Sequence, residues 1–356
     1  MDLAKIYRGR RVLVTGHTGF KGGWLCAWLL DLGADVTGVA LSPRDEVNLF
    51  DALELKRRMA SLIGDLRDAA LVQSIFEQAR PEVVFHLAAQ SLVRRSYAEP
   101  LETFATNVLG TAHVLNAARA TSSVRAVVNV TTDKVYQNRE WHWPYREIDA
   151  LGGLDPYSAS KACAELITTV YQRNLCREDR PVEIATARGG NVIGGGDWAA
   201  DRIVPDIVRA VVGGQPIVLR NPSAVRPWQH VLELCEAYLE LGGRLLTSER
   251  LFAEAWNFGP RPTKEITVSE LTRAMLDAWG CPEHPIEVRA LPFRESQVLR
   301  LDISKSISRL DWRPRLDIAE AVEMTARWYI AYYKDTRSAQ TLTLDQIHKF
   351  SATDAA

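Results

Sequence analysis

The chain has few cysteines and no long apolar run, and each absence excludes a class of protein. Its five cysteines, Cys26, Cys163, Cys176, Cys235 and Cys281, are widely spaced and include no CxxC pair. The sequence therefore predicts no disulfide framework and no metal site, and it indicates a reducing compartment. No segment approaches the roughly 18 consecutive apolar residues that a membrane helix needs, so we expect a cytoplasmic protein without membrane contact.

The chain also has almost no net charge. Its 43 basic and 44 acidic residues give a formal charge of -1, which provides no long-range field for nucleic acid or an anionic membrane. Any anionic partner must be bound by local charge. The hydrophobic fraction of 47% is typical of a globular protein, and 356 residues indicate one large unit with a smaller appended region.

The first half alternates apolar runs with helical patterns. Strands are predicted at 11–15, 35–40, 61–63, 82–88, 125–131 and 182–188, and helices at 24–32, 69–79, 101–119 and 158–171. This alternation is typical of right-handed βαβ units whose strands are buried on both faces. The sequence therefore predicts an α/β fold with a doubly wound parallel sheet.

A second region begins after residue 188, where glycine and proline interrupt the pattern. Residues 1–188 are expected to form a dinucleotide-binding domain, completed by a later segment near 226–258. Residues 189–335, with helices at 230–241, 267–279 and 318–333, are expected to form a smaller substrate-binding α/β region. The tail at 336–356 shows no convincing core face.

Three glycines follow the first strand in the segment GHTGFKG, at Gly16, Gly19 and Gly22. Glycine permits a tight turn and a close approach to a pyrophosphate, while free N–H groups at the following helix hold the negative charge. Glycines also occur in such turns for conformational reasons alone. Their position between this strand and this helix favours a dinucleotide site.

The residues that would read the adenosine end leave the choice of cofactor open. Ala40, Leu41 and Ser42 occupy the place of the usual ribose-binding acid, and Arg44 follows. Arg44 could meet a 2′-phosphate or could simply be solvated, so these residues alone do not decide between NAD and NADP. Asp65 could reach the adenine or could be the N-cap of the next helix.

Tyr157 and Lys161 lie four residues apart at the start of a predicted helix, so they share one face. A cation beside a phenol lowers the pKa of the phenol, which predicts that Tyr157 acts as a base on a sugar hydroxyl. The alternative is an exposed helical pair.

Thr131, Thr132, Asp133 and Lys134 end the fifth long strand, at the edge where open α/β sheets bind ligands. Thr132 could hydrogen-bond the reacting hydroxyl, and the adjacent acid and amine could divide the loss of a hydroxyl and the removal of a proton. A plain turn with a solvated Asp-Lys pair is the alternative.

These segments together resemble the CDP-glucose 4,6-dehydratase family within the extended short-chain dehydrogenases/reductases. The resemblance runs from about residue 10 to about residue 328 and includes GHTGFKG, FHLAAQSLVRRSY, TTDKVYQNREW, YREIDALGGLDPYSASKACAE, ARGGNVIGGGDW and RNPSAVRPWQHVLE. It implies a Rossmann-type fold, tightly held NAD, and deoxysugar biosynthesis for the lipopolysaccharide O-antigen. It also implies a homodimer built on 101–119 and 158–171, with a tetramer left open.

The resemblance further implies a reaction in three stages on a CDP-hexose. Tyr157 deprotonates the 4-hydroxyl as hydride passes to NAD, Lys134 assists removal of the C5 proton, and Asp133 protonates the departing 6-hydroxyl. Hydride then returns to C6 and gives a 4-keto-6-deoxy sugar. The segment 294–302 departs from the family pattern, so a lid or phosphate contact there is expected to differ.

Three groups of residues form the predicted site. Catalysis is expected from Thr132, Asp133, Lys134, Tyr157 and Lys161. Cofactor contacts are expected from Gly16, Thr18, Gly19, Phe20, Gly22, Asp65, Leu66, Leu87, Ala88, Ala89, Asn107, Thr131, Tyr157 and Lys161. Substrate contacts are expected from Gln90, Arg94, Asn191, Arg202, Arg220, Arg226 and His230, with Arg95 also near the sugar or diphosphate.

Three other functions share parts of this pattern. A nucleotide-sugar 4-epimerase has the glycine loop, Tyr157 and Lys161 but needs no acid and amine at C5 and C6, so Asp133 and Lys134 favour dehydration. A non-catalytic NAD-binding scaffold would share the fold alone. A dehydratase acting on a different nucleoside-diphosphate hexose is the third alternative.

Overall fold

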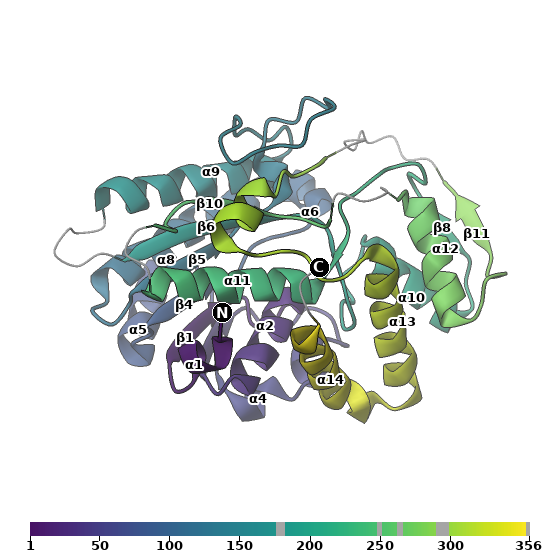
Figure 1. Cartoon of the computed structure of the whole chain (residues 1–356), viewed down its shortest axis with the longest axis horizontal. Coiled ribbons are helices and arrows are strands. Elements are labelled where there is room, and N and C mark those ends of the chain that lie inside the picture. Colours follow the sequence, from purple (N-terminus) through teal and green to yellow (C-terminus); the bar gives the residue numbers. More distant parts are fainter. Residues whose placement is uncertain (176–181, 248–250, 262–265, 290–298, 354–356) are drawn as a thin grey trace.

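The computed structural model describes residues 1–175, 182–247, 251–261, 266–289 and 299–353. Its centre is a sheet of seven parallel strands in the order β10-β6-β5-β4-β1-β2-β3 (Figure 1). The strands are β1 (Arg11–Thr15), β2 (Asp35–Ala40), β3 (Ala60–Ile63), β4 (Val83–His86), β5 (Ala126–Val130), β6 (Glu183–Gly189) and β10 (Ala255–Phe258). The order runs outward from β1 in both directions, so the predicted doubly wound sheet is confirmed.

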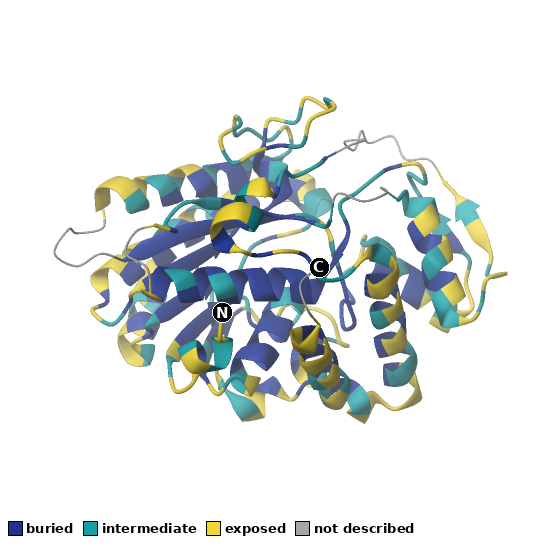
Figure 2. Cartoon of the chain, viewed as in Figure 1, coloured by how far each residue is buried: buried dark blue, intermediate teal, exposed yellow. Residues whose placement is uncertain are grey.

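Both faces of the sheet are covered by helices because successive strand residues point to opposite sides. Val12 and Val14 of β1 join the core under α2 (Phe20–Asp31) and α11 (Val231–Thr247), whereas Leu13 joins the core under α5 (Ala69–Ala79) and α8 (Gly110–Ala120). Figure 2 shows the central strands of the large sheet and α11 almost wholly buried. Helix α11, from the second half of the sequence, is therefore part of the helical layer that covers one face of the sheet.

The other elements on the N-terminal side connect these layers. They are α1 (Leu3–Tyr7), α3 (Leu49–Ala52), α4 (Leu55–Arg58), α6 (Val93–Ala98), α7 (Pro100–Phe104), η1 (Ala105–Leu109), η2 (Asp133–Val135), α9 (Pro156–Val170) and η3 (Tyr171–Leu175). The helix predicted at 101–119 is thus divided into α7, the π-helical turn η1 and α8. The predicted helix at 158–171 corresponds to α9.

A smaller group of elements lies beside the sheet (Figure 1). It contains β8 (Ile217–Leu219) paired with β11 (Ile286–Val288), together with α10 (Ile203–Gly213), α12 (Val268–Trp279) and α13 (Ile318–Lys334). The region also contains the short pair β7 (Val192–Ile193) and β9 (Gln229–His230) and the π-helical turn η4 (Ser306–Leu310). The assignment of separate cofactor and substrate roles to residues 1–188 and 189–335 stays a prediction.

The segment after Asp335 differs from the prediction of a tail without a core face. It forms η5 (Thr336–Ser338) and α14 (Ala339–Ala352), whose buried side chains include Ile347 and Phe350. Phe350 packs edge-on against Trp28 of α2, with ring centroids 5.9 Å apart. The apolar residues of α14 are spread among polar ones, so its buried face is hard to recognise without the partner helix.

Two observations bear on the expected environment of the protein. Within the described ranges, no helix combines the length and apolar character needed to cross a membrane. The cysteines of the described ranges, Cys26, Cys163, Cys235 and Cys281, are free thiols, and Cys176 lies outside these ranges.

Candidate active site

The glycine loop between β1 and α2 has a conformation that requires glycine at two positions. Gly16 has φ +81°, and a Cβ there would lie 2.8 Å from the backbone nitrogen of Ala88. A Cβ on Gly22 would lie 2.1 Å from the carbonyl oxygen of Gly16. Both distances are too short for a side chain, so the loop can pack against β4 and α2 only with glycine.

The start of α2 fits the pyrophosphate of a dinucleotide. Its N-cap is Gly19, which makes no side-chain capping bond, and its first turn holds no acidic residue. A Cβ on Gly19 would meet nothing nearer than 3.4 Å, so the approach to these N–H groups is open. Free N–H groups at the start of a helix attract negative charge, and this arrangement suits a phosphate.

Several predicted cofactor contacts border this loop. Thr18 Oγ1 donates to the carbonyl oxygen of Leu41 at 2.9 Å, which holds the loop against the end of β2. Leu87 and Ala88, directly after β4, bond to Thr15 of β1 through their backbone N–H groups. These small, partly buried residues, with Ala89 after them, line the carboxyl edge of the sheet next to Gly16. Phe20 begins α2 and is also partly buried.

Asp65 is neither an N-cap nor a free acceptor. Asp68 caps α5 by accepting from the backbone N–H of Leu71, so the N-cap alternative for Asp65 is wrong. Asp65 instead accepts from the Arg67 guanidinium at 2.8 and 2.5 Å, and this contact holds the pKa of Asp65 below its usual value. Leu66 is buried, and its carbonyl oxygen lies 2.8 Å from His113 Nδ1.

The predicted catalytic residues are brought together at the carboxyl end of β5. Thr132 and η2 follow this strand, and Tyr157 and Lys161 lie on the first turns of α9. Thr132 also lies close enough to the Tyr157 hydroxyl to lower its pKa. Tyr157, Thr132, Asp133 and Lys161 are all buried, whereas Lys134 is partly exposed. The two motifs, about 25 residues apart in the sequence, thus form one cluster.

Asp133 is suited to be an acid. Its Oδ1 accepts from Thr132 Oγ1 at 2.9 Å, whereas its buried Oδ2 has no hydrogen-bond partner among the described residues. Burial raises the pKa of the Asp133 carboxyl, although Lys134 and the bond from Thr132 oppose the rise. A carboxyl with a raised pKa can carry and donate a proton near neutral pH.

The expectation that Lys161 lowers the pKa of Tyr157 is wrong for this structure. Burial raises the pKa of Tyr157 to about 12, and the opposing influences are the Thr132 side chain and the Arg202 charge. Lys161 Nζ donates instead to the carbonyl oxygen of Val130 at 3.0 Å. Burial, together with the charge of Lys21, lowers the pKa of Lys161 to about 7.

Lys21 is a charged residue of the site that the sequence analysis did not select. It follows Phe20 in α2 and is partly buried, and this burial with the Arg202 charge lowers its pKa to about 8. Its charge acts on Lys161 and Asp133. A lysine inside the GHTGFKG segment was the available signal, but only the glycines, Thr18 and Phe20 of that segment were selected.

A buried ion pair joins the elements that carry the catalytic residues. Glu165 of α9 accepts from Arg188 Nη2 of β6 at 2.8 Å and from Thr131 Oγ1 at 2.5 Å. Arg188 Nη1 also donates to the Tyr136 hydroxyl at 2.9 Å and to the carbonyl oxygen of Glu147 at 3.1 Å. Thr131, predicted to contact the cofactor, therefore has its hydroxyl committed to Glu165. A glutamate and an arginine in otherwise apolar elements were the overlooked signals.

Two more predicted ligand contacts have their side chains fully used within the protein. Asn107 of η1 accepts from the Gln90 N–H at 2.8 Å and donates to Ser160 Oγ at 2.8 Å. The Gln90 amide bonds to Leu92 and Thr103. These buried amides join the segment after β4 to η1 and α9, and both residues stay predictions as ligand contacts.

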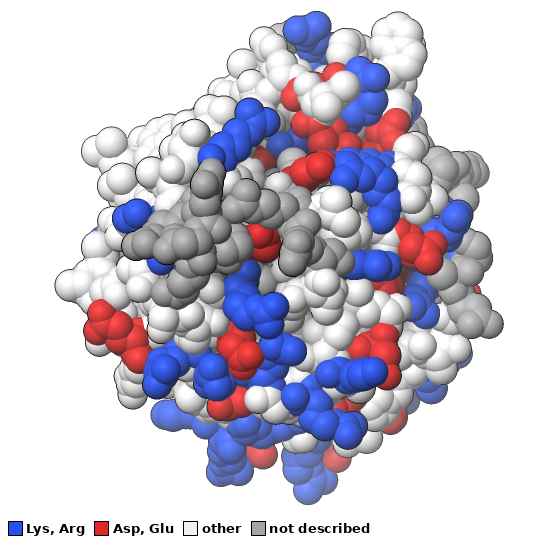
Figure 3. Space-filling view, turned by 60° about the vertical axis from the view of Figure 1, so that its left-hand side comes forward, with Lys and Arg blue, Asp and Glu red and all other residues white. Residues whose placement is uncertain are grey.

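The arginines predicted to bind the diphosphate meet at a shared acid. Arg94 of α6 and Arg220 after β8 both contact Asp201 Oδ1, at 2.8 and 2.7 Å. Arg202 contacts Asp197 at 2.9 Å and Ser91 at 3.2 Å. Figure 3 shows basic side chains interspersed with acidic ones over one face of the molecule. The meeting of two arginines at Asp201 is therefore not part of a large basic surface on that face.

The other predicted substrate residues are placed differently from one another. Arg226 lies close enough to Asp133 to lower its pKa, and Asn191 is exposed before β7. His230 is fully buried and packs edge-on against Trp24, with ring centroids 5.9 Å apart. Strand β9 turns its ring into the core, and a substrate contact of His230 stays a prediction. Residues 294–298 of the atypical segment lie outside the described residues.

Comparisons with known proteins connect this site to a family. The sequence model of the family described as GDP-mannose 4,6 dehydratase matches residues 13–325. A CDP-glucose 4,6-dehydratase of Salmonella typhimurium is 44% identical over 92% of this chain and 92% of its own. A dTDP-glucose 4,6-dehydratase of Streptomyces antibioticus is 31% identical over 89% of this chain and 92% of its own.

The solved structures give the same result. The dTDP-glucose 4,6-dehydratase of Streptomyces venezuelae, solved with NAD bound, superposes with a TM-score of 0.79 at 26% identity and covers 93% of this chain and 99% of that chain. The resemblance found in the motifs is confirmed. The chain belongs to the GDP-mannose 4,6 dehydratase family.

Proposed function

We propose that the chain dehydrates a nucleotide-activated hexose, CDP-D-glucose, to CDP-4-keto-6-deoxy-D-glucose. The observation that carries the proposal is Asp133, a buried carboxyl with a raised pKa and an unpaired oxygen beside Tyr157. An epimerase has no use for such an acid. The 44% identity to a CDP-glucose 4,6-dehydratase supports CDP-glucose as the substrate. We place the reaction in the cytoplasm, in deoxysugar biosynthesis for the lipopolysaccharide O-antigen.

The cofactor is NAD, and the structure offers it a fitting site. Gly16, Gly19 and Gly22 leave room that a Cβ would fill, and the start of α2 offers N–H groups to the pyrophosphate. Ala88 lies against Gly16 of this loop, and Thr18 ties the loop to Leu41. NAD supplies the acceptor for hydride from C4 of the hexose and the donor of hydride to C6.

Tyr157 is the base for the 4-hydroxyl. Because burial raises its pKa, loss of its proton depends on groups that stabilise the phenolate. The Thr132 side chain and the Arg202 charge act in that direction. Lys161, held by the Val130 carbonyl, lies one helical turn away on the same face of α9.

Asp133 and Lys134 perform the elimination. The 4-ketone acidifies the C5 proton, and Lys134 assists its removal while Asp133 donates its proton to the departing 6-hydroxyl, which leaves as water. A Cβ on Gly190 would lie 3.2 Å from Asp133 Oδ2, so glycine at this position keeps that oxygen accessible. Arg94, Arg202 and Arg220 are the local charges for the diphosphate.

Mass analysis of products from a panel of nucleoside-diphosphate hexoses tests the proposal. We expect loss of one water from CDP-glucose, with a product that gains ultraviolet absorbance in alkali, and little turnover of the UDP and dTDP analogues. A product of unchanged mass would indicate a 4-epimerase, and dehydration of another hexose would change the substrate. Binding of NAD without turnover of any sugar would indicate a scaffold.

We also propose a homodimer through α7 and α9. Leu101, Leu166 and Val170 on these helices are 82%, 56% and 48% exposed, which is unusual for aliphatic side chains so close together in the fold. Light scattering after gel filtration should give twice the chain mass, and a Leu101→Glu, Leu166→Glu variant should give the single mass. A monomeric parent would refute this, and a fourfold mass would indicate pairing of dimers.

A further inference from the structure

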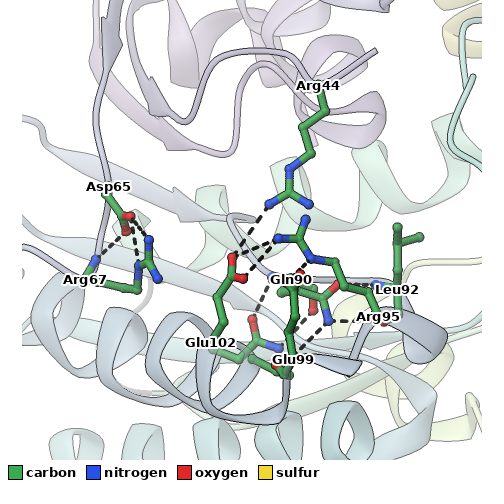
Figure 4. Close-up of polar contacts among 10 residues, drawn as sticks. Arg44, Asp65, Arg67, Gln90, Leu92, Arg95, Glu99 and Glu102 are labelled. Atoms are coloured by element: carbon green, nitrogen blue, oxygen red, sulfur yellow. Dashed lines mark hydrogen bonds and ion pairs between the residues drawn. The ribbon is translucent and has the colours of Figure 1, made fainter. Parts of the chain in front are cut away.

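A carboxylate from α7 faces two arginines beside the end of β2 (Figure 4). Glu102 contacts Arg95 Nη2 through both oxygens, at 3.1 and 3.0 Å. Its Oε1 also lies 3.8 Å from Arg44 Nη2. In Figure 4, Arg44 and Arg95 point toward Glu102 from different sides, so one acid is shared between two guanidinium groups.

Arg44 belongs to the segment that reads the adenosine ribose. Leu41, which directly follows β2, is bound to the glycine loop by Thr18. Arg44 is the only basic residue from Leu41 to Asn48. In dinucleotide-binding folds an arginine in this region accommodates a 2′-phosphate, and an acid binds the 2′-hydroxyl of NAD. No acid occupies the usual place here, so another residue must account for the preference for NAD over NADP.

We propose that Glu102 is the residue that makes the site discriminate against NADP. Its carboxylate holds Arg44 and places a negative charge where a 2′-phosphate would have to approach the guanidinium. A phosphate dianion would be repelled by Glu102 and would have to compete with it for Arg44. NAD has an uncharged 2′-hydroxyl, so Glu102 does not repel it and it does not compete with Glu102 for Arg44. The proposal rests on the proposed function only in assuming that NAD binds in this groove.

The surrounding charges support a specific role for Glu102. The third arginine of this region, Arg67, is held by Asp65 and lies apart from Arg44 in Figure 4. Glu99 contacts Arg95 Nε at 2.6 Å and forms no ion pair with Arg44 within the described residues. Glu99 is therefore a matched control, since it shares Arg95 with Glu102 and carries the same charge.

Calorimetric titration of NAD and NADP into the full chain, without any sugar, tests the proposal. The proteins are the parent, Glu102→Gln, Glu99→Gln and the double variant Glu102→Gln, Arg44→Ala, with thermal unfolding to confirm that each folds. We expect Glu102→Gln to tighten NADP about tenfold while the Kd for NAD changes less than about twofold. Adding Arg44→Ala should remove the gain, and Glu99→Gln should not produce it.

Three results would overturn the proposal. One is an unchanged NADP affinity in a folded Glu102→Gln variant. Another is an equal gain from Glu99→Gln, which would indicate a general charge effect. The last is a gain that survives Arg44→Ala. Failure to bind NAD by the parent chain would overturn the proposed function as well, whereas any of the three results with NAD bound would leave the dehydratase intact.

Discussion

Asp133 combines two properties that rarely occur together in one carboxyl. It is almost fully buried, and one of its oxygens makes no hydrogen bond within the described residues. An unsatisfied buried acid is costly unless it serves a ligand or a reaction, because burial favours the protonated form. Its position after β5 places that proton at the ligand edge of the sheet.

The variant Asp133→Asn should separate oxidation from elimination. The amide keeps the size of the side chain but has no acidic proton, so we expect kcat to fall at least about 100-fold. Proton removal by Tyr157 is preserved, and reduced cofactor should therefore accumulate transiently in rapid-mixing absorbance. Asp149→Asn, at a surface acid paired with Arg146, is the control. Unchanged kinetics for Asp133→Asn would contradict the role of Asp133.

Glu233 makes the stability of the fold depend on pH. It accepts backbone N–H bonds from Arg315 and Leu316 at 2.9 and 2.7 Å, yet burial raises its pKa to about 8. The folded state therefore keeps a proton that the unfolded chain loses near pH 4.5. Its stabilising contribution is complete below pH 4.5 and is lost as the pH rises through 8.

Urea unfolding at pH 5.5 and pH 8.5 should detect this contribution. We expect the free energy of unfolding to fall between these values by about 1 to 3 kcal/mol more in the parent than in Glu233→Gln. Glu323→Gln, which changes an exposed acid paired with Arg327, should behave like the parent. An identical pH dependence in the parent and Glu233→Gln would refute the assignment.

Spacing predicted much of the site but not the direction of its side chains. Tyr157 and Asp133 lie close enough to influence each other, because the helix start and the strand end share one edge of the sheet. The sequence could not reveal that Lys161 bonds to Val130 or that Asn107 is fully used internally. Such choices depend on the backbone of neighbouring elements.

At the scale of elements, the Glu165–Arg188 pair joins α9 to β6 and, through Thr131, to the end of β5. Both side chains are almost fully buried, and the carboxylate holds the pKa of Arg188 above its usual value despite burial. A buried charge without its partner is expensive. The pair therefore holds in place the carboxyl end of β5, which Thr132 and Asp133 follow.

A double-mutant cycle on this pair should show strong coupling. Glu165→Leu and Arg188→Met should each lower the free energy of unfolding by about 3 to 5 kcal/mol, because each leaves one buried charge unpaired. The double variant should lose clearly less than the sum of the two. Urea unfolding measures all four proteins, and simple additivity would show that the pair does not act as a unit.

Elements with continuous apolar runs were predicted best. The apolar runs that form β1, β2, β5 and β6 predicted strand bounds within two residues of those observed. Strands buried on both faces are almost continuously apolar, so such short runs are readily recognised in the sequence. The π-helical turn η1 and helix α14 were not predicted. A π turn changes hydrogen bonding without a marked change in composition, and the buried face of α14 mixes Thr343 and Gln346 with Ile347 and Phe350.

At the scale of the whole molecule, the C-terminal helix closes the core over α2. Phe350 is almost fully buried against Trp28, and Trp328 Nε1 of α13 donates to Thr343 Oγ1 at 3.0 Å. Residues more than 300 positions apart in the sequence thus stabilise each other. The last helix contributes to the stability of the helix that carries the glycine loop.

Phe350→Ala should therefore destabilise the entire protein. We expect the free energy of unfolding to fall by about 3 to 5 kcal/mol, because the substitution leaves a cavity against Trp28. Lys349→Ala, at the exposed neighbour on the same helix, should change it by less than about 0.5 kcal/mol. Thermal and urea unfolding provide the comparison, and equal stabilities of the two variants would show that α14 contributes little.

The sheet ends on a strand that is synthesised late. Strand β10 lies next to β6 but follows it by about 70 residues, and α11, which covers the central strands, lies between them in the chain. During translation the outer edge of β6 stays unpaired until β10, which ends at residue 258, has left the ribosome. The apolar face of the central strands likewise stays uncovered until α11 has been synthesised. A nascent chain that stalls near residue 190 would carry an unpaired strand edge, which is a substrate for chaperones and a site for aggregation.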